Sequence, residues 1–384
     1  MSNTKIRNRK RTARGLRSAS APPPAGNRLY EGCHSPRRTL HRTHHTQKTR
    51  SAMHLRIPGL RLRPIGPKPV VSALLAALLA TACGTPSPRR QLARHIDDAI
   101  ATSRATVGVA ILLPDGATFT RNDRPLPLLS VFKFPVALAV LDHMERTGRR
   151  LSDSLTVGSE WLAADTYSPM RDSLPATGGA VSLGGLLRYT VSQSDNIACD
   201  LLLDLVGGPA AVDEYLGSKG FPEITIRADE REMHRDMANQ RLNTARPSDI
   251  CRLFECFLEG GLLSRPHTAF LRQLLLATTT GADKLRAGVD PPFALGHKTG
   301  SSDRTPDGIR IADNDAGFIL MPDGRSCFIT VLVTDSPDDN ATNAAVTAQI
   351  ARAVCGYLLG TCPSDPSGRN SSAASAASGT DWQP

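Results

Sequence analysis

The sequence predicts a mixed fold, α/β plus all-α, in which a helical lobe is inserted into a sheet. Strand patterns occur in two blocks, residues 106–121 and 293–334. Helical patterns fill the residues between these blocks, from 130 to 258. A chain that leaves its sheet, forms helices and returns should place a cleft where the two parts meet. The expected lobes are residues 88–128 with 270–360 for the α/β lobe, and 129–269 for the helical lobe.

The first strand block follows a helix. Apolar residues recur at helical spacing within residues 91–103. Two strands, 106–113 and 117–121, are expected next because Pro114-Asp115-Gly116 between them is a hairpin signal. The fold therefore begins with a helix that leads into a sheet.

The helical lobe follows in five segments. Each is a run of apolar residues at helical spacing, separated from the next by Gly, Pro, Ser or Asp. Ser248 is a suitable N-cap for the last segment because its hydroxyl can accept a backbone N–H. The expected helices are 130–147, 182–192, 196–205, 209–217 and 249–258.

The second strand block should complete the sheet. Strands are expected at 293–299, 316–321 and 327–334, with a turn at Pro322-Asp323-Gly324 joining the last two. A helix over 341–358 follows. Together with the first block, this pattern predicts an antiparallel sheet flanked by terminal helices.

The formal charge of +10 is concentrated at the amino terminus. Of the 46 Lys and Arg residues, 17 fall within residues 1–82, which contain one acid, Glu31. Residues 83–384 therefore carry 29 basic and 35 acidic side chains, a net charge of −6. Since a nucleic-acid surface needs clustered positive charge, the body of the chain is not expected to bind nucleic acid.

Three terminal segments are not expected to join the fold. Residues 1–52 show no hydrophobic periodicity and should be disordered or follow from a misassigned start, although a basic nucleic-acid arm is an alternative. Residues 53–83 combine a basic stretch, a short apolar run and small residues, the pattern of an export signal. The ending at Cys83 is similar to a lipoprotein cleavage site, so a periplasmic protein is expected, with a lipid anchor at Cys83 as an alternative. The tail 364–384 should be disordered.

The cysteines and histidines do not indicate a metal site. Six cysteines lie in the body without a C-x-x-C pair, and we expect Cys199, Cys251 and Cys327 to be buried thiols because their neighbours are apolar. There is no H-E-x-x-H array. We expect a monomer that uses no metal and no organic cofactor.

A candidate nucleophile opens the first helix of the insertion. Ser130 is followed three residues later by Lys133 and then by an apolar run. This spacing places the hydroxyl and the ammonium on one helix face, within a turn of each other. A helix amino terminus also favours negative charge that develops nearby. The motif alone is weak, because S-x-x-K arises by chance in chains of this length.

Two further motifs strengthen the assignment. Ser194-Asp195-Asn196 lies in the helical lobe, and Lys298-Thr299-Gly300 ends a predicted strand. These three motifs, in this order, are the signature of class A β-lactamases and penicillin-binding proteins. From about Gln91 to Leu359, the chain resembles the class A serine β-lactamases. The resemblance implies a β-lactamase/transpeptidase-like fold and a small β-lactam molecule as substrate.

A fourth motif separates the members of this family. Glu230-x-x-Met233-His234 resembles the loop that carries the deacylating glutamate, in the form found in an extended-spectrum branch, where most class A enzymes read E-x-x-L-N. Glu232 is a rival for the base, but the Met-His placement favours Glu230. Asp200 stands where many relatives carry an Asn bonded to this loop, so the loop should be anchored differently here.

The resemblance also implies a role for each residue. Ser130 is the nucleophile, with Lys133 or Glu230 as the base of acylation, and Ser194 passes a proton to the leaving nitrogen. The backbone N–H groups of Ser130 and Ser301 should form the oxyanion hole. The residues expected to bind substrate are Asn196, Lys298, Thr299, Gly300, Ser301 and, as a wall of the cleft, Tyr167.

Three other functions remain open at this stage. A D-alanyl-D-alanine peptidase shares the three motifs but generally lacks the glutamate loop. A penicillin-binding sensor would be acylated and stay acylated, and a glutaminase also uses S-x-x-K. Glu230 favours the enzyme that hydrolyses its own acyl ester.

Overall fold

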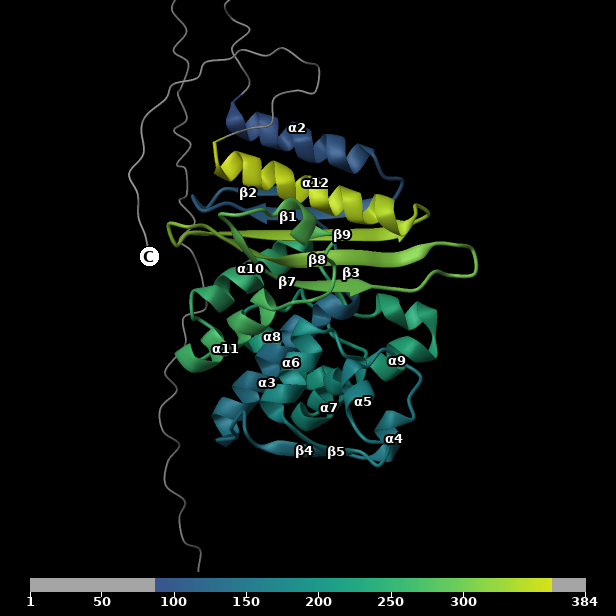
Figure 1. Ribbon diagram of the computed structural model, residues 1–384. Helices are drawn as coiled ribbons and strands as arrows, with labels where there is room; N and C mark the ends of the chain where they lie inside the picture. Colours follow the sequence, from purple (N-terminus) through teal and green to yellow (C-terminus); the bar gives the residue numbers. More distant parts are fainter. Residues whose placement is uncertain (1–86, 361–384) are drawn as a thin grey trace, which may run out of the picture. The chain divides into compact units, whose positions relative to one another are not determined.

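The computed structural model describes residues 87–360, which form an antiparallel five-stranded sheet with helices on both faces (Figure 1). The strand order is β2-β1-β9-β8-β7. Both terminal helices, α2 and α12, lie on one face, and the inserted helices lie on the other. The strands are β1 (Thr106–Leu112), β2 (Thr118–Arg121), β7 (Ala294–Ser301), β8 (Arg310–Leu320) and β9 (Ser326–Ser336).

The helices precede, connect and follow the two halves of the sheet. Residues 87–360 contain eleven α-helices. They are α2 (Pro88–Ala101), α3 (Lys133–Thr147), α4 (Ser159–Leu162), α5 (Pro169–Ser173), α6 (Leu183–Ser192), α7 (Asn196–Val206), α8 (Pro209–Ser218), α9 (Glu230–Arg235), α10 (Pro247–Leu258) and α11 (Arg265–Leu276), with α12 (Asn340–Leu358) closing the sheet as an eleventh.

The alternation of residues along β1 explains why both faces of the sheet are covered. Val107, Val109 and Ile111 belong to the core under α2 and α12. Ala110 and Leu112 point the other way, into the larger core with the inserted helices. Because successive side chains of a strand face opposite sides, a strand buried on both faces must be apolar throughout.

Aromatic stacking ties the first inserted helix to the sheet. Phe134 of α3 stacks on Phe254 of α10, with ring centroids 3.9 Å apart, and Phe254 meets Phe318 of β8 edge to face at 6.2 Å. Such pairs stabilise a core beyond the burial of their area. This contact fixes the start of α3, which begins at Lys133 directly after the turn that contains Ser130, relative to β8 and its neighbour β7.

Both predicted hairpin turns are confirmed. Gly116 and Gly324 adopt positive φ, +79° and +86°, at the ends of the two Pro-Asp-Gly turns. Leu113 N–H donates to Ala117 O across the first turn, and Met321 N–H donates to Arg325 O across the second. The sequence located these turns because glycine is the residue that adopts this backbone at low cost.

Some local predictions need correction. The first inserted helix does not begin at Ser130, since residues Leu129–Phe132 form a 3₁₀ turn before α3. Helix α10 is capped at Arg246 with Pro247 in its first turn, so Ser248 is not its N-cap. Strand β8 starts at Arg310, six residues before its predicted start. The prediction missed these six residues because Asp313 and other buried polar residues interrupt the apolar pattern of the strand.

Residues 126–245 also contain short strands that the sequence did not predict. The two ribbons are β3 (Leu126–Pro127) with β6 (Thr244–Ala245), and β4 (Ser154–Val157) with β5 (Gly179–Ser182). Strands of two to four residues are too short to show a hydrophobic period. Their pairing depends on long-range contacts.

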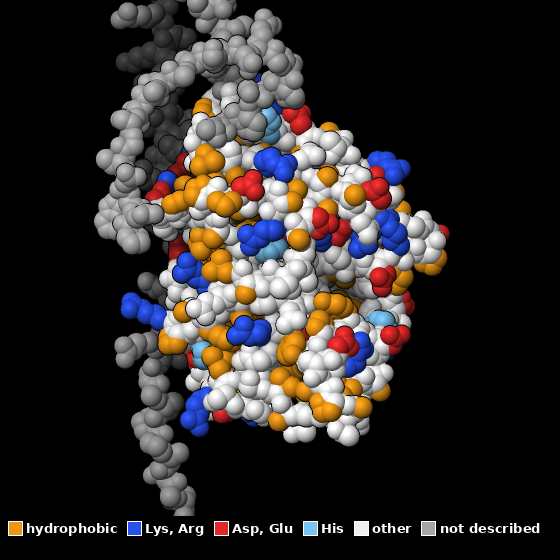
Figure 2. All heavy atoms as spheres, in the orientation of Figure 1, with side chains coloured by type: hydrophobic (Ala, Val, Ile, Leu, Met, Phe, Trp, Pro, Cys, Tyr) orange, Lys and Arg blue, Asp and Glu red, His pale blue; other side chains and the backbone are white. Residues whose placement is uncertain are grey.

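Several predictions lie outside the described residues. These are the predictions for residues 1–52, 53–83 and 364–384, including the lipid anchor at Cys83. Within residues 87–360, no helix is long and apolar enough to cross a membrane. All five described cysteines are free and buried, which confirms the expectation for Cys199, Cys251 and Cys327. On the face drawn in Figure 2, basic and acidic side chains are interspersed.

Candidate active site

Ser130 lies in a turn that contacts within the fold hold in an unfavourable backbone conformation. Leu129, just before it, has a φ of +45°, which is rare for a residue with a branched side chain. Buried Asn314 of β8 donates from Nδ2 to Pro127 O at 2.8 Å and to Leu128 O at 3.0 Å. Strained residues of this kind cluster at functional sites, where the surrounding structure supports them.

Lys133 is buried directly beneath this turn. Its ammonium donates to Ser194 O at 2.7 Å and to Asn196 Oδ1 at 2.6 Å, and it forms an ion pair with Glu230 Oε1 at 2.9 Å. An ammonium has three hydrogens, and these three acceptors account for them. Lys133 therefore joins the turn of Ser130, the S-D-N loop and the glutamate loop in one network.

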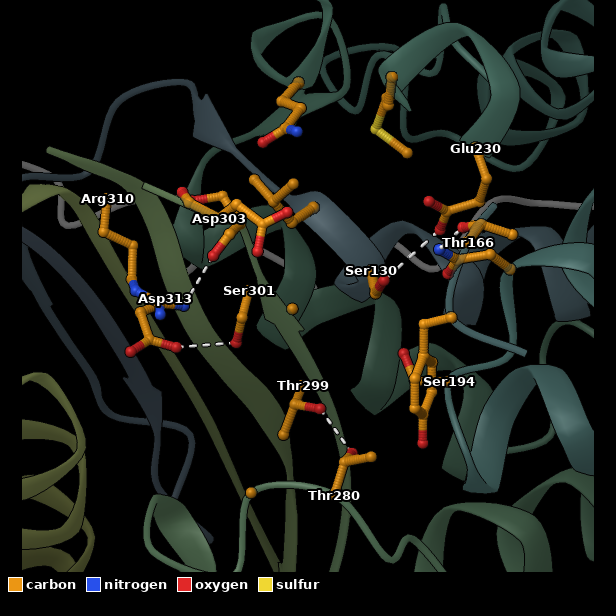
Figure 3. A pocket seen from close by; sticks show the side chains of 18 of the residues that line it. Ser130, Thr166, Ser194, Glu230, Thr280, Thr299, Ser301, Asp303, Arg310 and Asp313 are labelled. Atoms are coloured by element: carbon orange, nitrogen blue, oxygen red, sulfur yellow. Dashed lines mark hydrogen bonds between the residues drawn. The ribbon is translucent and has the colours of Figure 1, made fainter. Parts of the chain in front are cut away.

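Glu230 begins helix α9 and points at the nucleophile (Figure 3). Its Oε1 lies 3.4 Å from Ser130 Oγ, and its side chain is 11% exposed. Glu232, the rival glutamate, instead pairs with Arg235 and accepts from Asn239 Nδ2 at 2.9 Å. The structure thus brings Glu230, and not Glu232, next to Ser130.

The other two residues of the glutamate motif lie on different sides of the short helix α9, one in the core and one at the cleft. Met233 is buried in the large core. His234 is exposed and lines the cleft. Met233 holds the short helix against the lobe, so the helix presents Glu230 to the cleft.

Asp200 of α7 anchors this helix from below. Its carboxylate accepts the N–H of Glu230 at 2.8 Å and the N–H of Arg231 at 3.1 Å. Burial raises the pKa of Asp200 to about 7. The N–H donor of Glu230 opposes this rise, and the charges of Glu230 and Asp229 add to it. Since burial favours the uncharged form, the anchor titrates near neutral pH.

The raised pKa predicts how stability depends on pH. The folded protein holds the Asp200 proton up to about pH 7, whereas an unfolded chain releases it near its ordinary value of 3.8. Wild-type stability should therefore fall between about pH 4 and 7, by a few kcal/mol, and then level off. Asp200→Asn should lack this fall. Urea unfolding of both proteins at pH 5 and pH 8 would measure it, and parallel changes would contradict the prediction.

Ser194 and Lys298 meet on the opposite side of the cleft. Ser194 has a φ of +61° at the start of the S-D-N loop. Lys298 of β7 donates to Ser194 Oγ at 2.8 Å and to Thr299 O at 2.8 Å. Burial, with the nearby Lys133 charge, holds the pKa of Lys298 well below its usual range. A lysine of this kind can pass a proton to the hydroxyl that it contacts.

Asn196 sits where its amide can reach both the network and the cleft. Its Oδ1 accepts from Lys133, and its Nδ2 donates to Thr166 Oγ1 at 2.7 Å. One amide hydrogen remains for a ligand. Tyr167, next to Thr166, is 57% exposed and lines the same cleft, so it is placed to form a wall.

The K-T-G strand packs against the nucleophile turn. A Cβ on Gly300 would lie 2.6 Å from Leu128 O, 2.8 Å from Val131 N and 2.9 Å from Ser130 N. Only glycine allows β7 to approach this turn so closely. This approach places Ser301, at the end of the strand, on the rim of the cleft beside Ser130.

The cleft is a cavity of about 690 Å³ with a largely polar lining (Figure 3). Thr299 Oγ1 is hydrogen-bonded to Thr280 Oγ1 at 2.6 Å on its floor. Within residues 87–360, no group of three or more His, Cys, Asp or Glu side chains is arranged to hold a metal ion. Of the ten predicted site residues, the cleft lining includes Ser130, Ser194, Glu230, Asn196, Thr299, Gly300, Ser301 and Tyr167, and Lys133 and Lys298 are buried beneath it.

Several supporting residues escaped the sequence analysis. Asp195 caps α7 and accepts from Ala198 N, Met170 N and Ser168 Oγ, which locks the S-D-N loop to α5. An Asp before a helical run is an N-cap signal that could have indicated this role. Asn314 and Thr166 carry no such signal, because their partners are distant in the sequence.

Fold and site together define a serine hydrolase of the β-lactamase/transpeptidase-like class. A model of the β-lactamase enzyme family matches residues 91–358. A β-lactamase from Bacteroides uniformis is 38% identical over 266 residues, which cover 69% of this chain and 90% of the relative. The extended-spectrum β-lactamase PER-1 from Pseudomonas aeruginosa is 34% identical over 270 residues, 70% of this chain and 87% of the relative.

The solved structures agree with these relatives. The crystal structure of a representative of the class A β-lactamases from Bacteroides cellulosilyticus is 41% identical, with a TM-score of 0.68. The match covers 71% of this chain and 99% of that one. The chain therefore belongs to the β-lactamase enzyme family, as a class A serine β-lactamase that hydrolyses β-lactams.

Proposed function

We propose that each residue of the cleft acts in one step of a serine acyl-enzyme cycle. Ser130 Oγ attacks the lactam carbonyl and loses its proton towards Glu230, the acceptor that it contacts at 3.4 Å. This contact favours Glu230 over Lys133, whose three hydrogens are already donated. The backbone N–H groups of Ser130 and Ser301 stabilise the oxyanion, where losing one donor typically costs about 100- to 1,000-fold in rate.

Ring opening then needs a proton on the leaving nitrogen. Ser194 supplies it from its hydroxyl and is reprotonated by Lys298, whose ammonium lies 2.8 Å away. The lowered pKa of Lys298 supports this transfer. Thr299 and Lys298 bind the carboxylate of the substrate. Asn196 binds the amide in the side chain of the substrate.

Hydrolysis of the acyl ester completes the cycle. Glu230 first releases to solvent the proton that it took from Ser130, and Lys298 regains a proton from solvent. Glu230 then takes a proton from a water molecule, the water attacks the ester carbonyl, and the bond to Ser130 Oγ breaks with return of the proton to Ser130. The position of Glu230 beside Ser130 is the observation that supports turnover over a peptidase or a sensor that stays acylated.

A chromogenic cephalosporin tests this proposal directly. The purified full chain should turn over many equivalents of the compound, with a linear rise in absorbance after mixing. A rise that stops at one equivalent of product per protein would instead indicate a penicillin-binding sensor. Hydrolysis of D-alanyl-D-alanine peptides without β-lactam turnover would indicate the peptidase.

The substrate range and the cellular location are also proposals. The E-x-x-M-H motif and the similarity to a relative named as an extended-spectrum enzyme support cephalosporins as substrates. The pattern of residues 53–83 supports export to the periplasm, with lipidation of Cys83 as the alternative. Fractionation of cells that express the full chain would test this location, and retention in the cytoplasm would contradict it.

A further inference from the structure

A buried ion pair lies at the end of the cleft beyond Ser301. Lys284 Nζ lies 2.6 Å from Asp313 Oδ1, and their side chains are 8% and 5% exposed. Both residues line the cavity that contains Ser130. Neither residue takes part in the catalytic cycle described above, so this pair needs another explanation.

The pair also fixes the hydroxyl of Ser301 (Figure 3). Ser301 Oγ accepts from Lys284 Nζ at 2.9 Å and donates to Asp313 Oδ1 at 2.8 Å. A serine hydroxyl has one hydrogen and two lone pairs. Because Asp313 takes the hydrogen and Lys284 uses one lone pair, Ser301 can offer the cleft only a hydrogen-bond acceptor.

The same arrangement removes a free cation from this end of the cleft. Asp313 compensates the Lys284 charge at hydrogen-bond distance, so the ammonium has little net attraction for a carboxylate in the cleft. Two exposed carboxylates, Asp283 and Asp303, and one further cation, Arg310, line the same end. The five charged side chains give this end a net charge of −1.

We propose that Asp313 is a specificity-determining residue that favours β-lactams with a positively charged group on the ring substituent nearest their carboxylate. Its ion pair with Lys284 presents a hydrogen-bond acceptor and a slightly negative surface where a free lysine would present a cation. This inference rests on the proposed function, because it assumes that the substrate carboxylate lies near Thr299 and Ser301.

Asp313→Asn is a conservative test of this charge. Asp313 accepts from both Lys284 and Ser301 at the same atom, Oδ1, and an asparagine can keep its oxygen there. The variant therefore removes the negative charge while it can retain both hydrogen bonds. Replacing Lys284 with Gln in the same protein then removes the cation and returns this site to neutrality.

The experiment compares two cephalosporins that share their acylamino side chain. One carries a pyridinium group on its ring substituent, and the other carries an uncharged group of similar size. At low salt, the wild type should have the higher kcat/KM for the cationic compound, and added salt should reduce this preference. Asp313→Asn should lower the ratio of the two kcat/KM values by about three- to tenfold, mainly through KM. The double variant should restore the ratio to near the wild-type value.

Asp323→Asn is the matched control. Asp323 lies in the turn between β8 and β9, pairs with Arg325 and does not line the cleft, so it changes the net charge equally without changing the ratio. A wild type without salt-sensitive preference, or an Asp313→Asn enzyme with an unchanged ratio, would overturn the inference. The salt-sensitive preference of the wild type tests the inference even if a variant fails to fold. Failure of the wild type to hydrolyse either compound would overturn the proposed function instead.

Discussion

Glu230→Gln should stop the enzyme after its first reaction with a β-lactam. Acylation should slow because Glu230 is also its base, but the strained lactam can still acylate Ser130. The unstrained ester that results depends more strongly on an activated water, so it accumulates. A glutamine cannot accept the proton of this water, so turnover should fall by about 100- to 10,000-fold. With a penicillin, mass spectrometry should show intact protein plus the full mass of one β-lactam, since opening its ring releases no leaving group.

Two controls sharpen this prediction. Glu232→Gln changes the neighbouring glutamate of the same helix, which contacts Arg235 and Asn239, and should retain turnover. Ser130→Ala should show neither turnover nor adduct. A Glu230→Gln enzyme that remains unmodified would contradict the prediction, because acylation would then not proceed without Glu230. One that keeps wild-type turnover would remove Glu230 from the mechanism.

Gly300→Ala should have a comparably large effect without removing a reactive group. The new Cβ would come within 3 Å of three backbone atoms around Ser130, so β7 or the nucleophile turn must move. Displacing the two N–H groups of the oxyanion hole by about 1 Å should lower kcat/KM by about 100-fold or more. Steady-state kinetics with a chromogenic cephalosporin would measure this loss.

Gly217→Ala provides the matched control for the added methyl group. A Cβ on Gly217 of α8 would have no neighbour within 4 Å. Alanine also favours the helix, so stability should stay the same or rise by up to about 1 kcal/mol. Full activity of Gly300→Ala, with its fold retained, would mean that β7 can move without disturbing the nucleophile.

The sequence was sufficient for the sheet and for most inserted helices. Both Pro-Asp-Gly turns, the strands beside them and the helices around Ser194 and Asn196 lie where local patterns predict them. Local signals worked here because turns, caps and apolar periods depend on residues that are neighbours in the chain. The prediction failed for β8, where polar residues are buried because partners elsewhere in the fold satisfy them.

The order and spacing of Ser130, Lys133, Ser194, Glu230 and Lys298 already specified the chemistry, because reactive groups and their motifs are written in the sequence itself. Only the tertiary structure decided which glutamate faces the nucleophile, how Asp200 anchors it, and that Asp313 neutralises Lys284. These facts depend on distances of a few ångströms between residues 29 to 104 positions apart, and hydrogen bonds and charge pairs vary steeply with distance. Spacing along the chain does not determine such distances.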